Sequence, residues 1–400
     1  MDSAYTRGMP WLVLMLFFGF ALSQPAPSFQ VEEVARNLGV PWSLKFAPDG
    51  RLFFTQRDRT RIGVSALDLH SGRITTYEGE AAVRDEGEGG VMGLELDPGF
   101  ARNNKLYICY SYWKEGVQNE NNRRNRLSSF ILSGSRLTDE KILLDDMLGW
   151  WNHNGCRVVW GPDNKLYVSM GDAGDAPSNI PGEFGYAAKA QSSRLLAGKI
   201  FRLNPDGSIP SDNPFFNQAT GAARAIWTLG HRNPQGLAFQ PGTGLLWSTE
   251  HGPNTRDELN IIRKGKNYGW PRCTGIQPFG TVLTVSADNI TFNCTGGDLR
   301  ESYQPAVREY AGGNEPTIAP SNLLFYTGNA FPQWKGSLFF VTLKTGRLYR
   351  LELKGEQIVK EDLLINNQYG RLRDLAVGPD GFIYLSTDQG QILRLRPGSL

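Results

Sequence analysis

The fold is decided by a phrase that the sequence repeats, seen most clearly as Gly378-Pro379-Asp380-Gly381-Phe382-Ile383-Tyr384-Leu385. A small or apolar pair leads into a turn centred on proline, and a run rich in β-forming residues follows. Such a turn between apolar runs is typical of a β-hairpin. Five earlier versions of the phrase begin at Phe46, Leu96, Gly161, Gln240 and Phe331.

The spacing of the phrases predicts the architecture. Their prolines are 50, 64, 79, 91 and 47 residues apart, and a repeat of about 45–50 residues holds four short strands, which is one propeller blade. We therefore predict an all-β protein, a six-bladed β-propeller with four-stranded antiparallel blades and insertions in blades three and four. The segment Phe29–Val34 is expected to add an outer strand to the last blade and close the ring. A pair of β-sandwiches is the alternative, but no linker divides the chain, so residues 24–400 are expected to form a single domain.

Composition agrees with a β-rich chain and excludes some functions. The 400 residues include 46 glycines, more than the usual share of about 7%, and glycine favours turns. The 42 basic and 40 acidic residues leave a formal net charge of +2. A charge this small creates no field that would gather nucleic acid or coat a membrane surface.

The first residues are typical of an export signal. Arg7 precedes an apolar run over 11–20, and Ala21-Leu22-Ser23 offers the small residues that a signal peptidase recognises. A membrane anchor is the alternative, but the run is too short to cross about 30 Å of hydrocarbon. Residues 1–23 are therefore predicted to be a signal peptide. The mature protein is expected to be soluble and secreted, either extracellular or periplasmic, without membrane insertion.

A later segment carries marks of an oxidising compartment. Asn289 and Asn293 begin two glycosylation sequons. The four cysteines allow three pairings, which the sequence does not decide: Cys109, Cys156, Cys273 and Cys294. We favour a disulfide between Cys273 and Cys294, because these two residues bracket one polar stretch, an insertion at about 273–294.

Two polar residues around the third phrase form a candidate catalytic pair. His153 lies one predicted strand upstream of that phrase, and Asp172 follows its hairpin. Nineteen residues separate them, enough for one strand in each direction, so the two side chains can meet at one end of a blade. A histidine held by a carboxylate suits a general base. A purely structural His–Asp pair is the alternative.

Basic residues lie beside the later phrases. Arg232 and Asn233 directly precede the fourth phrase, and Lys344 follows the fifth. Arg371 and Arg373 are two apart on a predicted strand and would face the same side. Guanidinium groups suit carboxylates, often in bidentate contact. Each residue alone is more typical of a solvated surface charge, but their repeated placement predicts a site for a small polyanion held by several blades.

The sequence lacks the motifs of several other common enzyme classes. The glycine-rich stretch 87–93 lacks the spacing of the dinucleotide fingerprint, and a strand-like run follows it instead of a helix. The sequence contains no P-loop, no Gly-x-Ser-x-Gly elbow and no His-Glu-x-x-His motif. These observations disfavour nicotinamide, nucleotide-hydrolysing, serine-hydrolase and zinc-protease functions.

Several motifs occur in the order that is found in one known family. They are Pro41–Leu44, the His153 segment with Gly171-Asp172, Gly230–Gly236, Gly252-Pro253-Asn254, Asn267–Pro271, Pro316–Ser321 and Arg371–Asp374. In these motifs the sequence resembles the soluble quinoprotein glucose/aldose sugar dehydrogenases, which are glucose/sorbosone dehydrogenase-like six-bladed propellers that use pyrroloquinoline quinone (PQQ) and calcium. The resemblance runs from about residue 38 to 396.

The resemblance implies an activity and a role for each site residue. An aldose would be oxidised at its anomeric carbon to a lactone, and the hydride would pass to PQQ. An external electron acceptor would then take the electrons from the reduced cofactor. His153 would be the base, Asp172 would orient it, and Arg232 would stabilise charge on the quinone oxygens. The implied PQQ-binding set is Arg232, Asn233, Thr317, Lys344, Arg371 and Arg373. The backbone carbonyls of Gly252 and Pro253 would bind Ca²⁺, a hard cation that prefers oxygen.

Departures from the family pattern concern the substrate. Glu88 stands where the family has a sugar-contacting glutamine, and Asn152 stands where the glucose enzyme has an aspartate. Both positions are expected to contact the sugar, and the natural aldose stays open. Two other functions remain alternatives: a non-catalytic extracellular propeller that binds a glycan or protein, and a calcium-dependent lactonase.

Overall fold

The computed structural model describes residues 28–176, 189–274, 277–278, 303–311 and 316–398. The predicted signal peptide at 1–23, both sequons and Cys294 lie outside these residues. Within them the protein is all-β, as predicted. The helical elements whose bounds are fully described are short: α1 (Phe100–Asn103), η1 (Lys114–Gly116), η2 (Glu120–Asn122), η3 (Gly221–Ala225) and η4 (Pro332–Trp334). Residues 189–191 are also helical. None of the helices in the described part has the length and apolar character needed to cross a membrane.

The first half of the chain forms three antiparallel four-stranded units. Unit 1 contains β2 (Pro41–Phe46), β3 (Leu52–Gln56), β4 (Arg61–Leu67) and β5 (Ile74–Ala82). Unit 2 contains β6 (Val91–Leu96), β7 (Lys105–Trp113), β8 (Arg123–Ser133) and β9 (Arg136–Leu148). Unit 3 contains β10 (Val158–Trp160), β11 (Leu166–Met170), β12 (Lys199–Leu203) and β13 (Ile226–Leu229). A parallel bridge between Glu78 and Arg136 joins units 1 and 2 into one eight-stranded sheet.

The second half repeats this pattern three times. Unit 4 contains β14 (Pro234–Phe239), β15 (Leu246–Glu250), β16 (Asp257–Ile262) and β19 (Arg308–Tyr310). Unit 5 contains β20 (Pro320–Phe325), β21 (Leu338–Thr342), β22 (Arg347–Lys354) and β23 (Gln357–Asn366). Unit 6 contains β24 (Leu372–Val377), β25 (Ile383–Thr387), β26 (Gln391–Pro397) and β1 (Phe29–Ala35). A small pair, β17 (Cys273–Thr274) and β18 (Gln277–Pro278), lies between β16 and β19.

The repeated phrase is the turn between the first and second strands of every unit. The predicted hairpins are therefore confirmed. In unit 3 the phenol of Tyr167 donates to Asp163 at 3.1 Å, and in unit 6 Tyr384 donates to Asp380 at 2.7 Å. The turn aspartate thus ties the turn to the strand that follows, which explains why the phrase carries both residue types.

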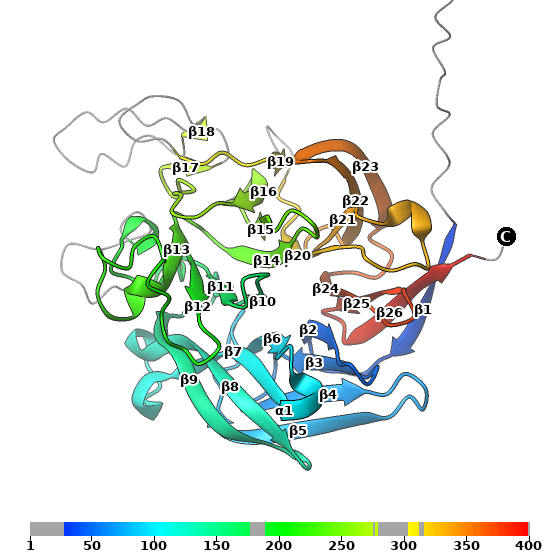
Figure 1. The fold of residues 1–400 in the computed structure, drawn as a ribbon, viewed down its shortest axis with the longest axis horizontal. Coiled ribbons are helices and arrows are strands. Elements are labelled where there is room, and N and C mark those ends of the chain that lie inside the picture. The colour runs from blue at the N-terminus through cyan, green and yellow to red at the C-terminus, as the bar shows by residue number, and fades with distance from the viewer. Residues whose placement is uncertain (1–27, 177–188, 275–276, 279–302, 312–315, 399–400) are drawn as a thin grey trace, which may run out of the picture.

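The six units succeed one another around the short axis of the molecule (Figure 1). Their first strands contact each other in a closed circuit, from β2 through β6, β10, β14, β20 and β24 back to β2. One apolar cluster fills each junction between neighbouring units; Phe53 with Leu106, for example, joins units 1 and 2. The core is thus divided among six junctions.

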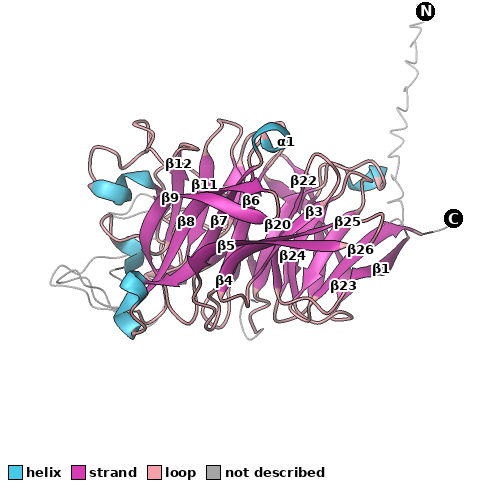
Figure 2. Ribbon diagram, turned by 90° about the horizontal axis from the view of Figure 1, so that it is seen from below, coloured by secondary structure: helices cyan, strands magenta, loops and turns pink. Residues whose placement is uncertain are grey.

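The chain closes on itself as predicted. β1 pairs antiparallel with β26, from Phe29 opposite Pro397 to Ala35 opposite Ile392. The extra residues of units 3 and 4 lie between β11 and β12, between β12 and β13, and between β16 and β19. Figure 2 shows the strands crossing the thickness of the molecule, with loops on both faces. Because the first two strands of each unit are antiparallel, the start of the first and the end of the second lie on one face.

Candidate active site

The predicted site residues lie in loops on that one face. Each loop either leads into the first strand of a unit or follows its second strand. Those before first strands are Glu88, Asn152, His153, Arg232, Asn233, Thr317 and Arg371, and those after second strands are Asp172, Gly252, Pro253 and Lys344. Arg373 lies within β24. These positions, which the repeat predicts, bring residues from units 2 to 6 to the same face of the molecule.

His153 and Asp172 form the predicted pair. The Nδ1 atom of His153 lies 2.7 Å from Oδ1 of Asp172, and both side chains are buried. Asp172 also accepts hydrogen bonds from the amide of Gly174 at 2.8 Å and from the indole of Trp270 at 2.7 Å. A carboxylate with this many donors favours the tautomer with the proton on Nδ1. The Nε2 atom is then the ring nitrogen that a ligand can approach.

The backbone of the His153 loop is held in an unusual conformation. Three of its residues have positive φ angles: His153 at 56°, Gly155 at 61° and Cys156 at 73°. Non-glycine residues rarely adopt this region, and they do so when surrounding contacts hold them there. The amide of His153 donates to Glu88 at 2.8 Å, which ties the predicted base to a predicted substrate residue.

A disulfide joins the same loop to the neighbouring unit. Cys156 is bonded to Cys109 of β7, and both residues are fully buried. This bond excludes two of the three pairings that the sequence left open, and it is compatible with the favoured Cys273–Cys294 pair. Because Cys294 lies outside the described residues, that second pairing stays a prediction.

Arg232 lies beside the loop predicted to hold calcium. Its Nη1 atom donates to the carbonyl of Gly252 at 2.7 Å and more weakly to that of His251 at 3.3 Å. The guanidinium lies 5.3 Å from the ring centre of Trp270, and its Nε atom is buried without a hydrogen-bond partner. Burial lowers the pKa of Arg232, although arginine stays charged at any physiological pH.

Two further histidines are accounted for by protein contacts. His231 is fully buried, with Nδ1 2.8 Å from Glu250 and Nε2 2.8 Å from Thr228, so both ring nitrogens have protein partners. The Nε2 atom of His251 lies 2.9 Å from the carbonyl of Pro320, and since a carbonyl can only accept, this nitrogen carries the proton. Burial lowers the pKa of His251, which keeps its ring neutral.

A buried carboxylate that sequence reasoning missed organises the Gly252 and Thr317 loops. Asp257 accepts from the amide of Gly252 at 2.9 Å, from the hydroxyl of Thr317 at 2.5 Å and from the amide of Ile318 at 2.6 Å. Thr317 is therefore positioned by unit 4 although it precedes unit 5. Asn233 is likewise engaged, since its Oδ1 accepts from Gln235 at 3.0 Å.

Arg371 directly precedes β24 and does not lie within it as predicted, yet its side chain and that of Arg373 meet at a shared partner. Arg373 makes two bonds to Asp388, at 2.8 and 2.7 Å, and Arg371 reaches the same carboxylate at 2.8 Å. Burial opposes ionisation of Asp388, but the charges and hydrogen bonds of the two arginines outweigh it and lower the pKa to about 2. Asp388 therefore stays ionised and offsets one of the two positive charges.

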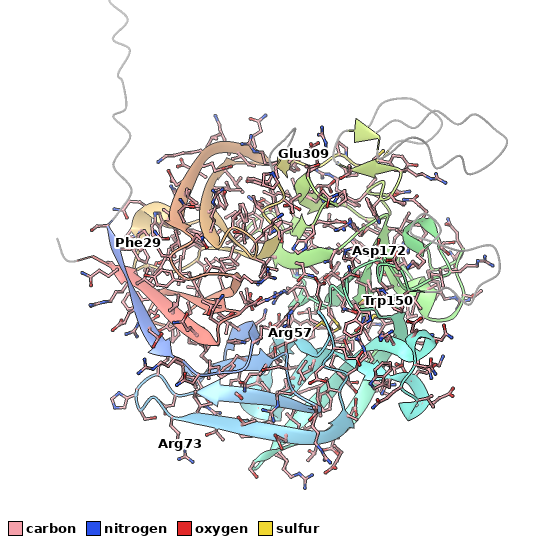
Figure 3. The ribbon with its side chains drawn as sticks, turned by 180° about the vertical axis from the view of Figure 1, so that it is seen from behind. Phe29, Arg57, Arg73, Trp150, Asp172 and Glu309 are labelled. Carbon is pink, nitrogen blue, oxygen red and sulfur yellow. A yellow bond between two sulfur atoms is a disulfide. The ribbon has the colours of Figure 1, made fainter. Side chains whose placement is uncertain are left out.

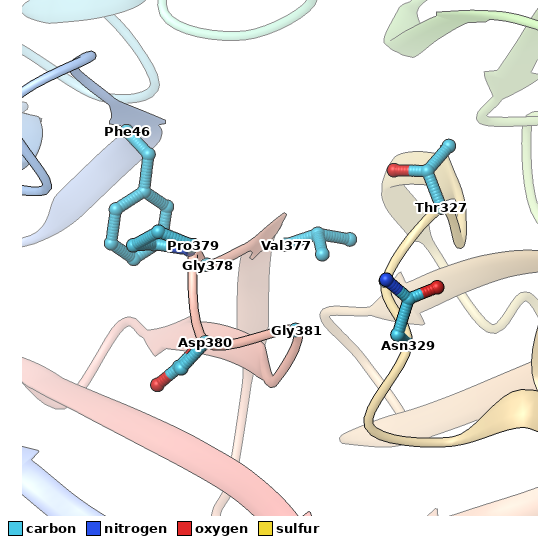
Figure 4. Close-up of a pocket in the computed structure, with 9 residues that line it drawn as sticks. Phe46, Thr327, Asn329, Val377, Gly378, Pro379, Asp380 and Gly381 are labelled. Atoms are coloured by element: carbon cyan, nitrogen blue, oxygen red, sulfur yellow. The ribbon is translucent and has the colours of Figure 1, made fainter.

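The centre of this face contains a small cavity of about 30 Å³. Its lining comes from all six units: Trp42, Arg57, Glu88, Met92, Asn154, Gly155, Gln235, His251, Leu343, Arg371 and Arg373. Of the predicted site residues, only Glu88, Arg371 and Arg373 line this cavity. The others do not line it: Asn152, His153, Asp172, Arg232, Asn233, Gly252, Pro253, Thr317 and Lys344. Figure 4 shows a larger pocket, about 430 Å³, bounded by Phe46, Thr327 and Pro379. That pocket lies at the repeated turns, and none of the predicted site residues lines it.

The residues missed by sequence reasoning share a position that the repeat could have revealed. Arg57, His251 and Asp388 directly follow the second strands of units 1, 4 and 6. Asp172 and Lys344 hold nearly the same place in units 3 and 5. Aligning the six phrases and reading the residues after each second strand would have found them. No local signal marked Trp270, whose contact with Asp172 spans 98 residues.

Comparisons with known proteins agree with this arrangement. The model of the family described as Glucose / Sorbosone dehydrogenase matches residues 38–394. Aldose sugar dehydrogenase YliI of Escherichia coli is 31% identical over 97% of this chain and 98% of its own length. Quinoprotein glucose dehydrogenase B of Acinetobacter calcoaceticus is 30% identical over 93% of this chain and 88% of its own length.

Solved structures give the same result. The PQQ-bound aldose sugar dehydrogenase from Streptomyces coelicolor matches with a TM-score of 0.71 and 26% identity, covering 93% of this chain and 99% of that one. The apo aldose sugar dehydrogenase from Escherichia coli matches with a TM-score of 0.75 and 29% identity, over 93% and 100%. Because the family match spans nearly the whole described chain, this protein is an enzyme of the glucose/sorbosone dehydrogenase family.

Proposed function

We propose that this protein is an exported, PQQ- and calcium-dependent dehydrogenase that oxidises the anomeric carbon of an aldose to a lactone. The observation that carries the proposal is the His153–Asp172 pair at 2.7 Å, on the same face as Arg232, Lys344, Arg371 and Arg373. A base beside a concentration of cations suits removal of a proton next to an anionic acceptor.

We further propose that the six units are blades of a single propeller domain. The closed circuit of first strands, the apolar cluster at each junction and the β1–β26 pairing all support this architecture. In a propeller, loops at one end of the central axis form a shared site. This explains how residues more than 200 positions apart, such as His153 and Arg371, serve one ligand.

The residues present fit a small tricarboxylate such as PQQ. Arg232 has a buried Nε atom without a partner. Lys344 is exposed, and within the described residues its ammonium group has no hydrogen-bond or ion-pair partner. Together with Arg371 and Arg373 these cations would hold carboxylates, while Asn233 and Thr317 would contribute neutral polar contacts.

Calcium would depend on backbone oxygens. Within the described part of the chain, no group of three or more His, Cys, Asp or Glu side chains is placed to hold a metal ion. The carbonyl of Gly252 accepts from the cationic Arg232, so Ca²⁺ can bind this oxygen only if the guanidinium moves away. We propose that this carbonyl and that of Pro253 bind Ca²⁺, with Arg232 adjusting to share the site.

Side chains of the protein would accept the proton that the sugar releases. When bound, PQQ supplies the acceptor that takes a hydride from the anomeric carbon. The Nε2 atom of His153 accepts the proton of the anomeric hydroxyl, and Asp172 stabilises the imidazolium that forms. The Arg232 guanidinium stabilises negative charge that develops beside it. Glu88 and Asn152 are proposed to contact the sugar, and electrons leave to an external acceptor.

Reconstitution tests the proposal. Protein expressed without PQQ is titrated with PQQ in the presence of Ca²⁺, and dye reduction is measured over a panel of aldoses, with lactone detected as product. A matched sample without Ca²⁺ is the control, and we expect little activity in it. Stoichiometric PQQ binding with no oxidation of any aldose would rule out the enzyme activity. Failure to bind PQQ would rule out the cofactor assignment.

A further inference from the structure

Arg57 is a cavity residue that the proposed site does not use. It directly follows β3 of unit 1, the place that Asp172, His251 and Asp388 hold in other units. It lines the central cavity together with Glu88, Arg371 and Arg373. Figure 3 labels Arg57 toward the middle of the molecule, whereas the labelled Arg73 and Glu309 lie at the periphery.

The guanidinium of Arg57 lacks a protein partner. Across the described residues, no hydrogen bond or ion pair to this group is present. Its two arginine neighbours in the cavity, Arg371 and Arg373, are both bound to Asp388. Arg57 is only half exposed, and burial together with the charge of Arg373 lowers its pKa. The charges of Asp388, Glu88 and Asp58 act on Arg57 in the opposite direction, but none of these carboxylates is in hydrogen-bond contact with it. Binding an anion directly would therefore stabilise this partly buried cation.

The backbone at Arg57 is fixed before any ligand binds. Its amide donates to the carbonyl of Val40 at 2.8 Å, and its carbonyl accepts from the amide of Val91 at 3.2 Å. Gly90 packs against it so closely that a Cβ there would lie 1.9 Å from the Arg57 carbonyl oxygen and 2.8 Å from its Cγ. Glycine at position 90 therefore makes room for Arg57, and this anchoring lowers the entropy lost on binding.

The carboxylates near Arg57 are already engaged. The charges of three carboxylates act on Arg57: Asp388 is bound by two arginines, Glu88 accepts the amide of His153, and Asp58 accepts the amide of Val40. A planar guanidinium matches a carboxylate in bidentate geometry. We propose that Arg57 binds a carboxylate of the ligand in the central cavity. Resting on the proposed function, the source is either a carboxylate of PQQ or the carboxylate of an acidic sugar such as a uronic acid.

The test compares Arg57→Ala and Arg57→Lys with Arg61→Ala. Arg61 lies in the same unit, and its side chain is 64% exposed, so it controls for loss of a nearby charge. PQQ binding to the apo protein is followed by fluorescence titration, and glucuronate binding by calorimetry. We expect Arg57→Ala to raise the Kd of one of these ligands roughly 10- to 100-fold. Arg57→Lys should show a smaller effect, and Arg61→Ala none.

Measuring both ligands shows whether the carboxylate belongs to PQQ or to an acidic sugar. It also distinguishes failure of the Arg57 proposal from failure of the proposed function. An effect on PQQ alone assigns the cofactor, and an effect on glucuronate alone assigns the sugar. If the wild type binds glucuronate through Arg57 but does not bind PQQ, the proposed function fails while the anion site stands. Unchanged Kd values in Arg57→Ala, or a wild type that binds neither probe, would overturn the inference. Thermal unfolding of each variant confirms that it is folded.

Discussion

His153 has one ring nitrogen committed and one available, and this asymmetry underlies its proposed role. Asp172 holds Nδ1 at 2.7 Å and is itself fixed by Gly174 and Trp270. An imidazole with its tautomer set by a carboxylate is prepared to accept a proton on Nε2. His231 shows the contrast, because its two nitrogens are both bound within the protein.

Replacing His153 with glutamine should lower kcat at least about 100-fold, because a general base typically contributes 10²–10⁴-fold. PQQ affinity should change little, since the cations, not this ring, are proposed to hold the cofactor. Steady-state kinetics and a PQQ titration measure the two effects separately. The surface variant His70→Ala, at an exposed position, should retain wild-type activity. A loss of PQQ binding in the His153 variant would instead show a structural role.

Asp388 should make a pH-dependent contribution to stability. Its pKa is about 2 in the folded protein and about 3.9 when unfolded, so its ionised form favours folding by about 2.5 kcal/mol. This contribution is complete above about pH 4 and is lost as the pH falls toward 2. Asp388→Asn should therefore lower the free energy of unfolding at pH 7 by at least that amount.

The difference between wild type and Asp388→Asn should shrink between pH 4 and pH 2. Denaturant titrations at several pH values measure it, and Asp85→Asn, at an exposed position, serves as the control. A difference that stays constant over this range would show that hydrogen bonding, not ionisation, accounts for the effect of the substitution.

At the scale of elements, the His153 loop depends on the strands around it. The disulfide to Cys109 ties the loop to β7, and the amide of Cys156 donates to the carbonyl of Ser169 in β11 at 2.7 Å. Gly171 lies so close that a Cβ there would meet the His153 carbonyl at 2.0 Å. The position of His153 is thus set by three contacts outside its own loop.

Removing the disulfide by the double change Cys109→Ala and Cys156→Ala should lower kcat about 10-fold or more, because small displacements of a catalytic group are costly. It should also lower stability by about 2–4 kcal/mol. Gly171→Ala is the matched variant, since it displaces the loop while keeping the disulfide, and it should lower kcat as well. Unchanged kcat in both variants, measured well below their melting temperatures, would contradict this view of the loop.

For the whole molecule, closure depends on β1. This strand completes unit 6 by pairing with β26, and Phe29 packs against Trp334 of unit 5 at 5.9 Å between ring centres. A chain that begins at Ser28 keeps the strand, whereas one that begins at Asn37 loses it. The shorter chain exposes the edge of β26, which favours aggregation.

We expect the chain that begins at Asn37 to melt at least about 5 °C below the chain that begins at Ser28. It should also elute partly as aggregate in size-exclusion chromatography. Equal melting temperatures and a monodisperse profile for the shorter chain would show that β1 is dispensable for closure.

Much of the fold follows from local features of the sequence. The proline-centred phrase marks the turn between the first two strands of each unit, and in units 2, 3 and 6 an Asp–Tyr bond stabilises that turn, as in Asp380 and Tyr384. The two-residue spacing of Arg371 and Arg373 predicted that they lie together, and both reach Asp388 although Arg371 lies just outside β24. These features act over a few residues, so a single sequence reveals them.

Contacts between residues far apart in the sequence determine the rest of the candidate site. Asp388 offsets the charge of the two arginines, Trp270 holds Asp172, and Arg57 is left without a partner. The favoured cysteine pairing remains a prediction, while the observed Cys109–Cys156 bond joins two different units. Turn chemistry and strand periodicity depend on neighbouring residues, and they were enough to predict the repeated hairpins and the closure of the chain by β1. Which charges neutralise each other depends on distances between separate units, and these distances exist only once the ring of sheets has formed.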